Sequence, residues 1–176
     1  MYIPPERLER LFNDEPKSEI IDPSYVASFS RNGHELPAYH IRSLTSVAQR
    51  HFVTDGSYTF TLEEHKPIAV IAFDFLSHGI MYVKQIQGGI GSGEQLQKIR
   101  WQRLLLSYLV DWARSAKASQ VRVQPARRNK YYNNGPEEYQ ASKKQLNERL
   151  ETHYDSTAKS LGFILSDDEE YYYLDL

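Results

Sequence analysis

The feature that most constrains the fold of this chain is a continuous apolar run, Ile68–Phe73. An uninterrupted apolar run of strand length is typical of a strand that is covered on both faces in the middle of a sheet. Turn-forming residues bound the run, with Lys66-Pro67 before it and Ser77-His78-Gly79 after it. The run therefore predicts a central β-strand.

Two neighbouring segments extend this strand into a meander. Tyr58–Leu62 alternates polar and apolar residues as a half-buried strand does, and Ile80–Ile86 has the composition of a third strand. Short turns join the three segments. Because tight turns connect antiparallel neighbours, we expect an antiparallel meander.

After the third strand the apolar period changes from strand to helix. A glycine-rich loop, Gly88–Gly93, leads into a segment with apolar residues at three- and four-residue spacing. Its apolar positions are Leu96, Trp101, Leu104, Leu105, Tyr108, Leu109, Trp112 and Ala113. Val121–Val123 then has the composition of a strand. Strand, helix and strand in this order predict a βαβ crossover and a parallel strand pair.

A second long helix is predicted from Pro136 onward, ending at Gly162, which suits the position after a helix C-terminus. Its predicted buried face consists of Tyr139, Leu146, Leu150, Tyr154, Ala158 and Leu161. Two final strands follow, Phe163–Leu165 and Tyr171–Leu174. The acidic run Asp167–Glu170 between them is interpreted as a solvated hairpin tip.

Earlier in the chain, short helices are predicted at residues 4–13 and Leu44–Phe52, with a turn-rich segment between them. The predicted fold class is thus α/β (α+β). It has a mixed central sheet, an antiparallel N-terminal meander and a parallel βαβ pair, flanked by helices. We expect an N-terminal extension over residues 1–37 and one domain over residues 38–176.

The composition excludes several classes of site. There are no cysteines, which rules out disulfides, thiolate zinc sites and a cysteine nucleophile. The histidines are scattered without the spacing of metal ligands, so no metal site is expected. Lys+Arg number 21 against 23 Asp+Glu, which argues against a protein that coats nucleic acid. Without a signal peptide or a membrane-length apolar run, we predict a cytoplasmic protein with no membrane contact.

The order of predicted elements resembles that of the Gcn5-related N-acetyltransferase (GNAT) superfamily. The segment Ala158–Phe163, followed by a polar turn and a tyrosine-rich strand, is similar to the last helix of that family and its Leu-Gly-Phe exit. Ile41–Leu44 resembles the start of its first strand and helix. The resemblance implies an acyl-CoA-dependent N-acyltransferase. Acetyl-CoA or another acyl-CoA would be the co-substrate, and the acyl group would pass directly to an unknown amine acceptor.

The resemblance places CoA where the third strand meets the glycine-rich loop. A helix N-terminus offers unpaired N–H groups to a pyrophosphate, and glycines allow close approach of the main chain. The residues implied are Gln85, Ile86, Gln87, Gly88, Gly89, Gly91, Ser92 and Gly93. Main-chain donors near Ile86 and Gln87 would polarise the thioester carbonyl, and Lys98, Arg100 and Arg103 could add positive charge. The family's Gln/Arg-x-x-Gly-x-Gly/Ala pattern is not matched in either register.

Two catalytic roles have candidate residues. Family members often carry a proton-donating tyrosine at the position that is Ala158 here. Tyr154, one helical turn earlier, could take that role if the helix is shifted, and the alternative is a core tyrosine. Asp74, Glu63 and Glu64 are candidates for the general base, and Asp74 is preferred because it follows a buried apolar run, which would raise its pKa. The alternative is that Asp74 begins a turn.

The missing motif also leaves a second function open, a catalytically inactive GNAT-like domain that binds a ligand, a protein or nucleic acid. A basic cluster, Arg122, Arg127, Arg128 and Lys130, precedes Tyr131. It could hold nucleic acid, the 3′-phosphate of CoA or an acidic substrate, or form a solvated loop. The long connection from Pro125 to Pro136 is the predicted place of the acceptor site. The C-terminal strands could pair two copies into a homodimer.

Overall fold

The computed structural model describes residues 52, 55–63, 66–97, 99–132 and 143–176, together with the backbone of four short strands between residues 25 and 43. The helix predicted at residues 4–13 lies outside the described residues. The same holds for residues 44–51 of the second predicted helix and for the predicted start of the last helix at Pro136.

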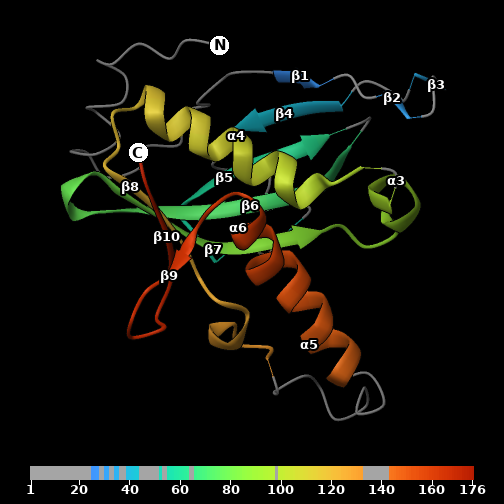
Figure 1. Ribbon diagram of the computed structural model, residues 1–176. Helices are drawn as coiled ribbons and strands as arrows, with labels where there is room; N and C mark the ends of the chain where they lie inside the picture. The colour runs from blue at the N-terminus through green and yellow to red at the C-terminus, as the bar shows by residue number, and fades with distance from the viewer. Residues whose placement is uncertain are drawn as a thin grey trace.

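The centre of the protein is a mixed sheet with the strand order β1-β4-β5-β6-β7-β8-β10-β9 (Figure 1). In that order the strands are Tyr25–Ala27, Tyr39–Ser43, Tyr58–Glu63, Pro67–Leu76, Ile80–Gly88, Gln120–Val123, Tyr172–Asp175 and Ile164–Leu165. Strands β2 (Ser30–Arg31) and β3 (His34–Glu35) form a separate hairpin. Among the described strands, β7 and β8 pair in parallel and the other neighbours pair antiparallel. The predicted fold class, with its meander and its parallel pair, is confirmed.

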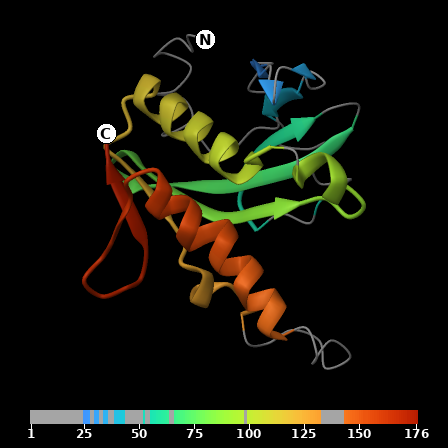
Figure 2. The same ribbon diagram turned by 45° about the vertical axis from the view of Figure 1, so that its right-hand side comes forward.

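The helices cover the sheet in two groups. The predicted long helix after β7 is divided into α3 (Gly93–Gln97) and α4 (Trp101–Ser115). The last helix consists of α5 (Lys143–Glu151), a π-helical turn η4 (Thr152–Ser156) and α6 (Thr157–Ser160). Figure 2 shows α5 and α6 running obliquely across β6 and β7, and α6 also contacts α4. Two short 3₁₀ turns, η1 (Ser77–Gly79) and η2 (Ala126–Arg128), complete the described elements.

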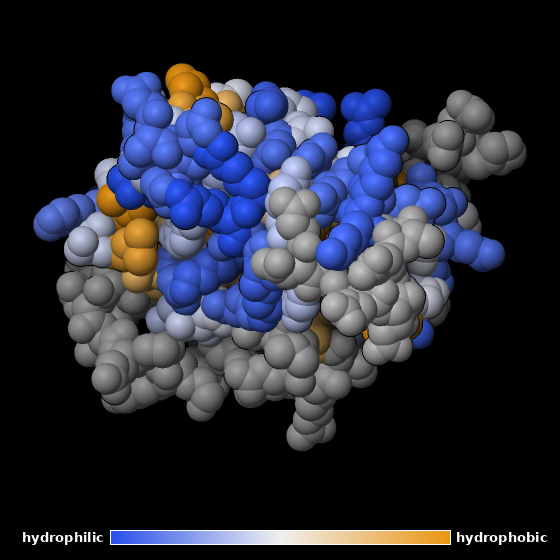
Figure 3. All heavy atoms as spheres, turned by 90° about the horizontal axis from the view of Figure 1, so that it is seen from below, coloured by the Kyte–Doolittle hydropathy of each residue, from blue (hydrophilic) through white to orange (hydrophobic). Residues whose placement is uncertain are grey.

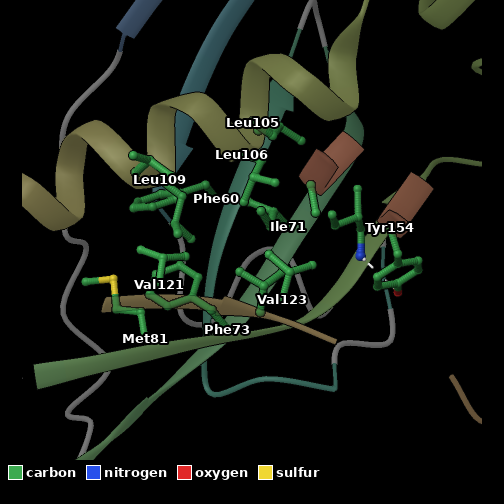
Figure 4. Close-up of a cluster of buried hydrophobic side chains, with 14 of the residues drawn as sticks. Phe60, Ile71, Phe73, Met81, Leu105, Leu106, Leu109, Val121, Val123 and Tyr154 are labelled. Atoms are coloured by element: carbon green, nitrogen blue, oxygen red, sulfur yellow. Dashed lines mark hydrogen bonds between the residues drawn. The ribbon is translucent and has the colours of Figure 1, made fainter. Parts of the chain in front are cut away.

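One large apolar core lies between the sheet and these helices (Figure 4). Leu105 and Leu109 of α4 are fully buried in it, as predicted, and so is Leu106, which the predicted helix face did not include. The predicted Leu104 and Tyr108 are only partly buried. Aromatic rings form its centre: Phe60 lies edge-on to Trp112, with ring centroids 5.4 Å apart, and Phe73 packs beside both. Such ring pairs add about 0.5–1.5 kcal/mol each beyond their buried area. The core therefore fixes α4 over the meander.

Strand β5 is more deeply buried than its sequence predicts. Thr59 and Thr61, taken as the solvent-facing side of a half-buried strand, are 5% and 0% exposed. The Thr61 hydroxyl donates to Glu63 Oε1 at 3.1 Å. A threonine can be buried when its methyl group packs and its hydroxyl is hydrogen-bonded, so polarity alone did not reveal that both faces are covered.

The acidic turn between β9 and β10, residues Asp167–Glu170, is exposed as predicted, and it also forms long-range ion pairs. Glu169 forms an ion pair with Arg127, and Glu170 forms one with Arg128. These pairs join the hairpin tip to the loop that follows β8. The predicted exposed hairpin tip is confirmed. The ion pairs themselves could not be predicted from local sequence, because the partners lie about forty residues away along the chain.

Gly56 allows a test of the packing before β5. A Cβ atom at this position would lie 2.6 Å from the Phe73 main-chain nitrogen and 2.9 Å from its oxygen. Since strand backbone cannot move aside cheaply, we expect Gly56→Ala to lower the free energy of unfolding by about 1–3 kcal/mol. Urea unfolding measures this. Gly93→Ala is the matched control, because no described atom lies within 4 Å of its added Cβ. Equal stability of the two variants would contradict the packing argument.

Candidate functional site

The candidate site is built around the point where β7 separates from β8. The parallel register covers only Ile80–Val83 of β7, and Gln124 N–H donates the next hydrogen bond to Val83 O at 2.9 Å. Strand β7 then continues to Gly88, paired with β6 on its other side. Its register with β6 shifts at Ala72/Phe73, which leaves Lys84 as an extra residue in β7. Such bulges bend a strand, and here the bulge accompanies the separation.

Beyond Val83, the edge of β7 from Lys84 to Gly88 no longer pairs with β8, and this opening between the two strands is called the gap. Two consecutive side chains of the π-helical turn, those of His153 and Tyr154, occupy it. Ile86 N–H donates to Tyr154 Oη at 3.1 Å, and the Tyr154 hydroxyl lies 3.4 Å from its acceptor, Lys84 O. His153 hydrogen-bonds the backbone of Ile86 as well. Tyr154 is 1% exposed and stands at one end of the buried cluster (Figure 4). Side chains thus replace β8 as the hydrogen-bonding partner of β7.

The π-helical turn explains how Tyr154 reaches this position. A π-turn inserts an extra residue into a helix and is often found at functional sites. Leu150 and Ala158 stay buried on either side of η4, as predicted. The sequence predicted that Tyr154 needs a shifted helix to reach the site, and η4 supplies a local change of register. Tyr154 is a core residue, which was the alternative prediction, and its hydroxyl also lies in the gap.

Tyr154 makes a further hydrogen bond to the loop after β8, and burial determines its protonation state. Asn129 Nδ2 donates to Tyr154 Oη at 3.1 Å, and Asn129 Oδ1 accepts from Tyr131 N–H at 3.0 Å. Burial, aided by the charge of Asp55, raises the pKa of Tyr154 to about 12, against the lowering effect of the hydrogen bonds from Ile86 and Asn129. The phenol is therefore protonated at neutral pH and holds a proton that it can donate.

Asp74 lies within β6, opposite Tyr82, rather than at a strand end. Burial acts to raise its pKa, but hydrogen bonds from Lys84 and from Ser57 outweigh burial, so the pKa of Asp74 is lowered. The expected raised pKa is wrong. Lys84 Nζ lies 2.5 Å from Asp74 Oδ2, and the main-chain oxygen of Lys84 faces the Tyr154 hydroxyl. Asp74 is therefore connected to the gap through Lys84.

The glycine-rich loop forms a tight turn between β7 and α3. A Cβ on Gly88 would lie 2.8 Å from Leu96 Cδ1 and would displace the end of that side chain, and one on Gly89 would lie 3.1 Å from the Ile68 oxygen and would crowd the backbone of β6. Gly91 has a φ of +77°, which favours glycine. Added Cβ atoms at Gly91 and Gly93 would meet no described atom within 4 Å.

Three other residues that were predicted to bind CoA, Ser92, Gln85 and Gln87, do not all belong to the glycine turn. Ser92 is 1% exposed, and its main-chain oxygen accepts from Leu96 N–H at 3.0 Å. Gln85 is 7% exposed and accepts from Asp55 N–H at 2.9 Å, while its Nε2 donates to Gln87 Oε1 at 2.5 Å. Gln85 and Gln87 therefore belong to a polar cluster with Asp55 rather than to the glycine turn.

A surface hollow of about 190 Å³ lies between the start of α4 and the π-helical turn. Its lining residues are Arg100, Gln102, Arg103, Thr152, Ser156, Thr157 and Ser160. The first turn of a helix presents main-chain N–H groups and partial positive charge, and two arginines add full charges. Guanidinium and hydroxyl groups are common ligands of phosphate. The hollow has the chemistry of an anion site, and it contains two of the three predicted cationic residues.

The hollow and the gap lie close together along the same two elements. Thr152 lines the hollow, and the next residues, His153 and Tyr154, reach β7. Arg100 lines the hollow, and the next residue, Trp101, meets His153 edge-on with ring centroids 5.0 Å apart. The Trp101–His153 contact therefore stands between the two features.

The sequence prediction missed three residues at this site, Asp55, Asn129 and His153. Asn129 and its neighbour Lys130 do lie in the long connection where the acceptor site was predicted. Asp55 and His153 have no local signal, because their partners are far away in the chain: Lys130 Nζ and Asp55 Oδ1, for example, are 75 residues apart in sequence.

The described part of the chain contains no group of three or more His, Cys, Asp or Glu residues that could hold a metal ion. Over the same residues, no helix is both long and apolar enough to cross a membrane.

Comparison with known proteins gives little further guidance. No protein-family model and no curated protein matches the sequence. One solved structure with similarity is a protein from Bacillus anthracis str. Ames that is proposed to be a streptothricin acetyltransferase, determined in complex with acetyl coenzyme A. The two chains share 13% identity, with a TM-score of 0.42, over 100% of this chain and 95% of the other.

The burial of His153 predicts an acid-sensitive stability. Burial, aided by the charge of Arg149, lowers the pKa of His153 to about 4, against about 6.5 in an unfolded chain. The stabilising effect of the neutral ring is complete above pH 6.5 and is lost as pH falls towards 4, because only the unfolded state gains the proton in that window. We expect the free energy of unfolding to fall by about 2 kcal/mol more in the wild type than in His153→Gln between pH 7 and pH 5. Urea unfolding at both pH values tests this, and parallel losses would contradict it.

Proposed function

We propose that this protein is an acyl-CoA-dependent N-acyltransferase that transfers an acetyl or other acyl group directly to an amine. The observation that carries the proposal is the gap beside β7, where a buried, protonated Tyr154 meets the Ile86 N–H group. An acyl-CoA supplies an acyl group activated as a thioester. The reaction needs main-chain donors for the carbonyl oxygen and a proton for the departing sulfur.

The hollow at the start of α4 is the proposed site of the phosphate groups of CoA. Arg100 and Arg103 bring positive charge to one wall, and hydroxyl groups of η4 and α6 line the other. The side chain of Arg100 makes no capping hydrogen bond to α4. The predicted glycine-loop residues, Gly88 to Gly93, would then shape the turn that leads to this site. The closest phosphate contacts would be made at the start of α4, after the short helix α3.

The edge of β7 is the proposed site of the thioester arm. Successive main-chain groups on one edge of a strand belong to alternate residues, so Lys84, Ile86 and Gly88 direct their N–H and C=O groups to the same side. Tyr154 and His153 now bond to Ile86 on that side. A ligand with amide groups could replace these bonds without leaving buried polar groups unsatisfied.

Tyr154 is the proposed general acid. Its pKa of about 12 keeps the proton on Oη at neutral pH, and hydrogen bonds from Ile86 and Asn129 fix the position of the oxygen. Asp74 supports this arrangement by pairing with Lys84, whose carbonyl faces the Tyr154 hydroxyl. In this proposal Tyr154 would protonate the departing sulfur, and Asp74 would position Lys84.

A second function, ligand binding without acyl transfer, is favoured by one observation. The backbone of Ile86 is hydrogen-bonded by both Tyr154 and His153, so the gap is closed by side chains. If the gap stays closed, the protein would bind anions in the hollow, but the thioester could not reach Tyr154 and no thiol would be released.

The first test concerns binding. We expect Arg100→Ala and Arg103→Ala each to weaken acetyl-CoA binding about tenfold or more, because each removes a charge-assisted contact of about 1.5–3 kcal/mol. Isothermal titration measures the affinity. Arg114→Ala is the matched control, since Arg114 lies on the same helix and pairs with Asp111. No binding to the folded wild type would overturn the proposed function.

The second test concerns chemistry. We expect Tyr154→Phe to reduce the release of CoA thiol in the presence of amines by about 10²-fold or more, because the proton donor is lost. A thiol reagent measures the rate over a panel of amines, and titration shows whether acetyl-CoA still binds the variant. Binding by the wild type without thiol release from any amine would leave ligand binding as the function.

A further inference from the structure

An ammonium group is held close to the gap by a carboxylate and an aromatic ring. Lys130 Nζ lies 2.7 Å from Asp55 Oδ1 and 5.2 Å from the centre of the Tyr131 ring. The Lys130 side chain is 54% exposed and that of Asp55 35% exposed, so solvent reaches the pair. A carboxylate with an adjacent aromatic face is a common arrangement for binding an organic ammonium ion.

The position of Asp55 links this ammonium group to the gap. Asp55 N–H donates to Gln85 Oε1 on β7, and the negative charge of Asp55 contributes to the raised pKa of Tyr154. On the other side, Asn129 donates to Tyr154 Oη, and Lys130 is the next residue in the chain. The pair thus lies beside the proposed proton donor.

We propose that Asp55 and Tyr131 form the subsite for the ammonium group of the acyl acceptor, and that Lys130 occupies this subsite in the structure. The inference rests on the proposed function and names the acceptor class as a primary alkylamine that is charged in solution. Lys130 is then an internal competitor that the acceptor displaces.

The energies are consistent with displacement. Exposed ion pairs and exposed cation–π contacts are both weak, so Lys130 is held by contacts that are easily exchanged. The hydrogen bond to Asp55, with the nearby charges, raises the pKa of Lys130, so its own amine is held in the charged, unreactive form. An external amine can replace it with contacts of the same kind.

The proposed step balances as follows. The ammonium loses a proton to the Asp55 carboxylate and from there to solvent, which frees the nitrogen lone pair. A C–N bond forms to the acyl carbon, the C–S bond breaks, and the sulfur takes a proton from Tyr154. The second N–H proton of the nitrogen restores the Tyr154 hydroxyl through solvent. The products are an N-alkyl amide and a thiol, with one proton released overall.

The test uses binding of n-butylammonium, followed by NMR on the folded full chain, with neutral n-butanol as the matched probe. We expect Asp55→Asn to weaken n-butylammonium binding about threefold to fivefold, since it removes the charged partner in an exposed site. We expect Lys130→Gln to strengthen it about fivefold, because the internal competitor is gone. Binding of n-butanol should be the same in all three proteins. Equal n-butylammonium affinity in the wild type and Asp55→Asn, or weaker binding to Lys130→Gln, would overturn the subsite.

Titration with acetyl-CoA separates this inference from the proposed function. Both variants should bind acetyl-CoA as the wild type does, because Asp55 and Lys130 do not line the hollow. If the wild type binds n-butylammonium through Asp55 but does not bind acetyl-CoA, the proposed function fails and the ammonium subsite stands. If acetyl-CoA binds and the n-butylammonium affinity does not depend on Asp55, the subsite fails alone. Unchanged urea unfolding of Asp55→Asn confirms that the variant is folded.

Discussion

The hydrogen bond from Ile86 N–H to Tyr154 Oη is the interaction on which the site depends. A main-chain donor buried without a partner costs about 1–3 kcal/mol, and β8 cannot serve as the partner because its pairing with β7 ends at Val83. The phenol of Tyr154 supplies the missing acceptor at 3.1 Å. To place it there, the last helix includes a π-helical turn, and Asn129 holds the oxygen from the opposite side. One interrupted strand pair therefore accounts for the unusual features around it.

The same bond gives Tyr154 two roles that compete. Its ring is part of the core, and its hydroxyl closes the gap that the proposed ligand would enter. Full burial favours the protonated phenol, which suits a proton donor, but it also means that binding must replace existing hydrogen bonds. Such a site binds only ligands that offer equivalent donors and acceptors, since others would leave the Ile86 N–H unpaired. In the proposed function, the closed gap would therefore select ligands that carry amide groups.

The sequence correctly predicted those features of the fold that depend on local residue patterns. The apolar run became β6, the helical period became α4, and Gly162 adopts a φ of +84° after the last helix. The π-helical turn could not be predicted, because Leu150, Tyr154 and Ala158 keep four-residue spacing across it. The pKa of Asp74 was predicted in the wrong direction because one of its partners, Ser57, lies 17 residues away. Tertiary contacts of that kind leave no trace in local composition.

The basic cluster shows most clearly how the structure divides a group that is uniform in sequence. Arg127 and Arg128 pair with Glu169 and Glu170, which ties the loop after β8 to the β9–β10 hairpin. With the loop held from that side, the two following residues face the gap, Asn129 towards Tyr154 and Lys130 towards Asp55. The arginines thus anchor the loop, and the lysine pairs with Asp55 beside the proposed site. A planar guanidinium suits fixed pairing with carboxylates, whereas the compact ammonium of Lys130 is the group that an external amine would replace in the proposed subsite.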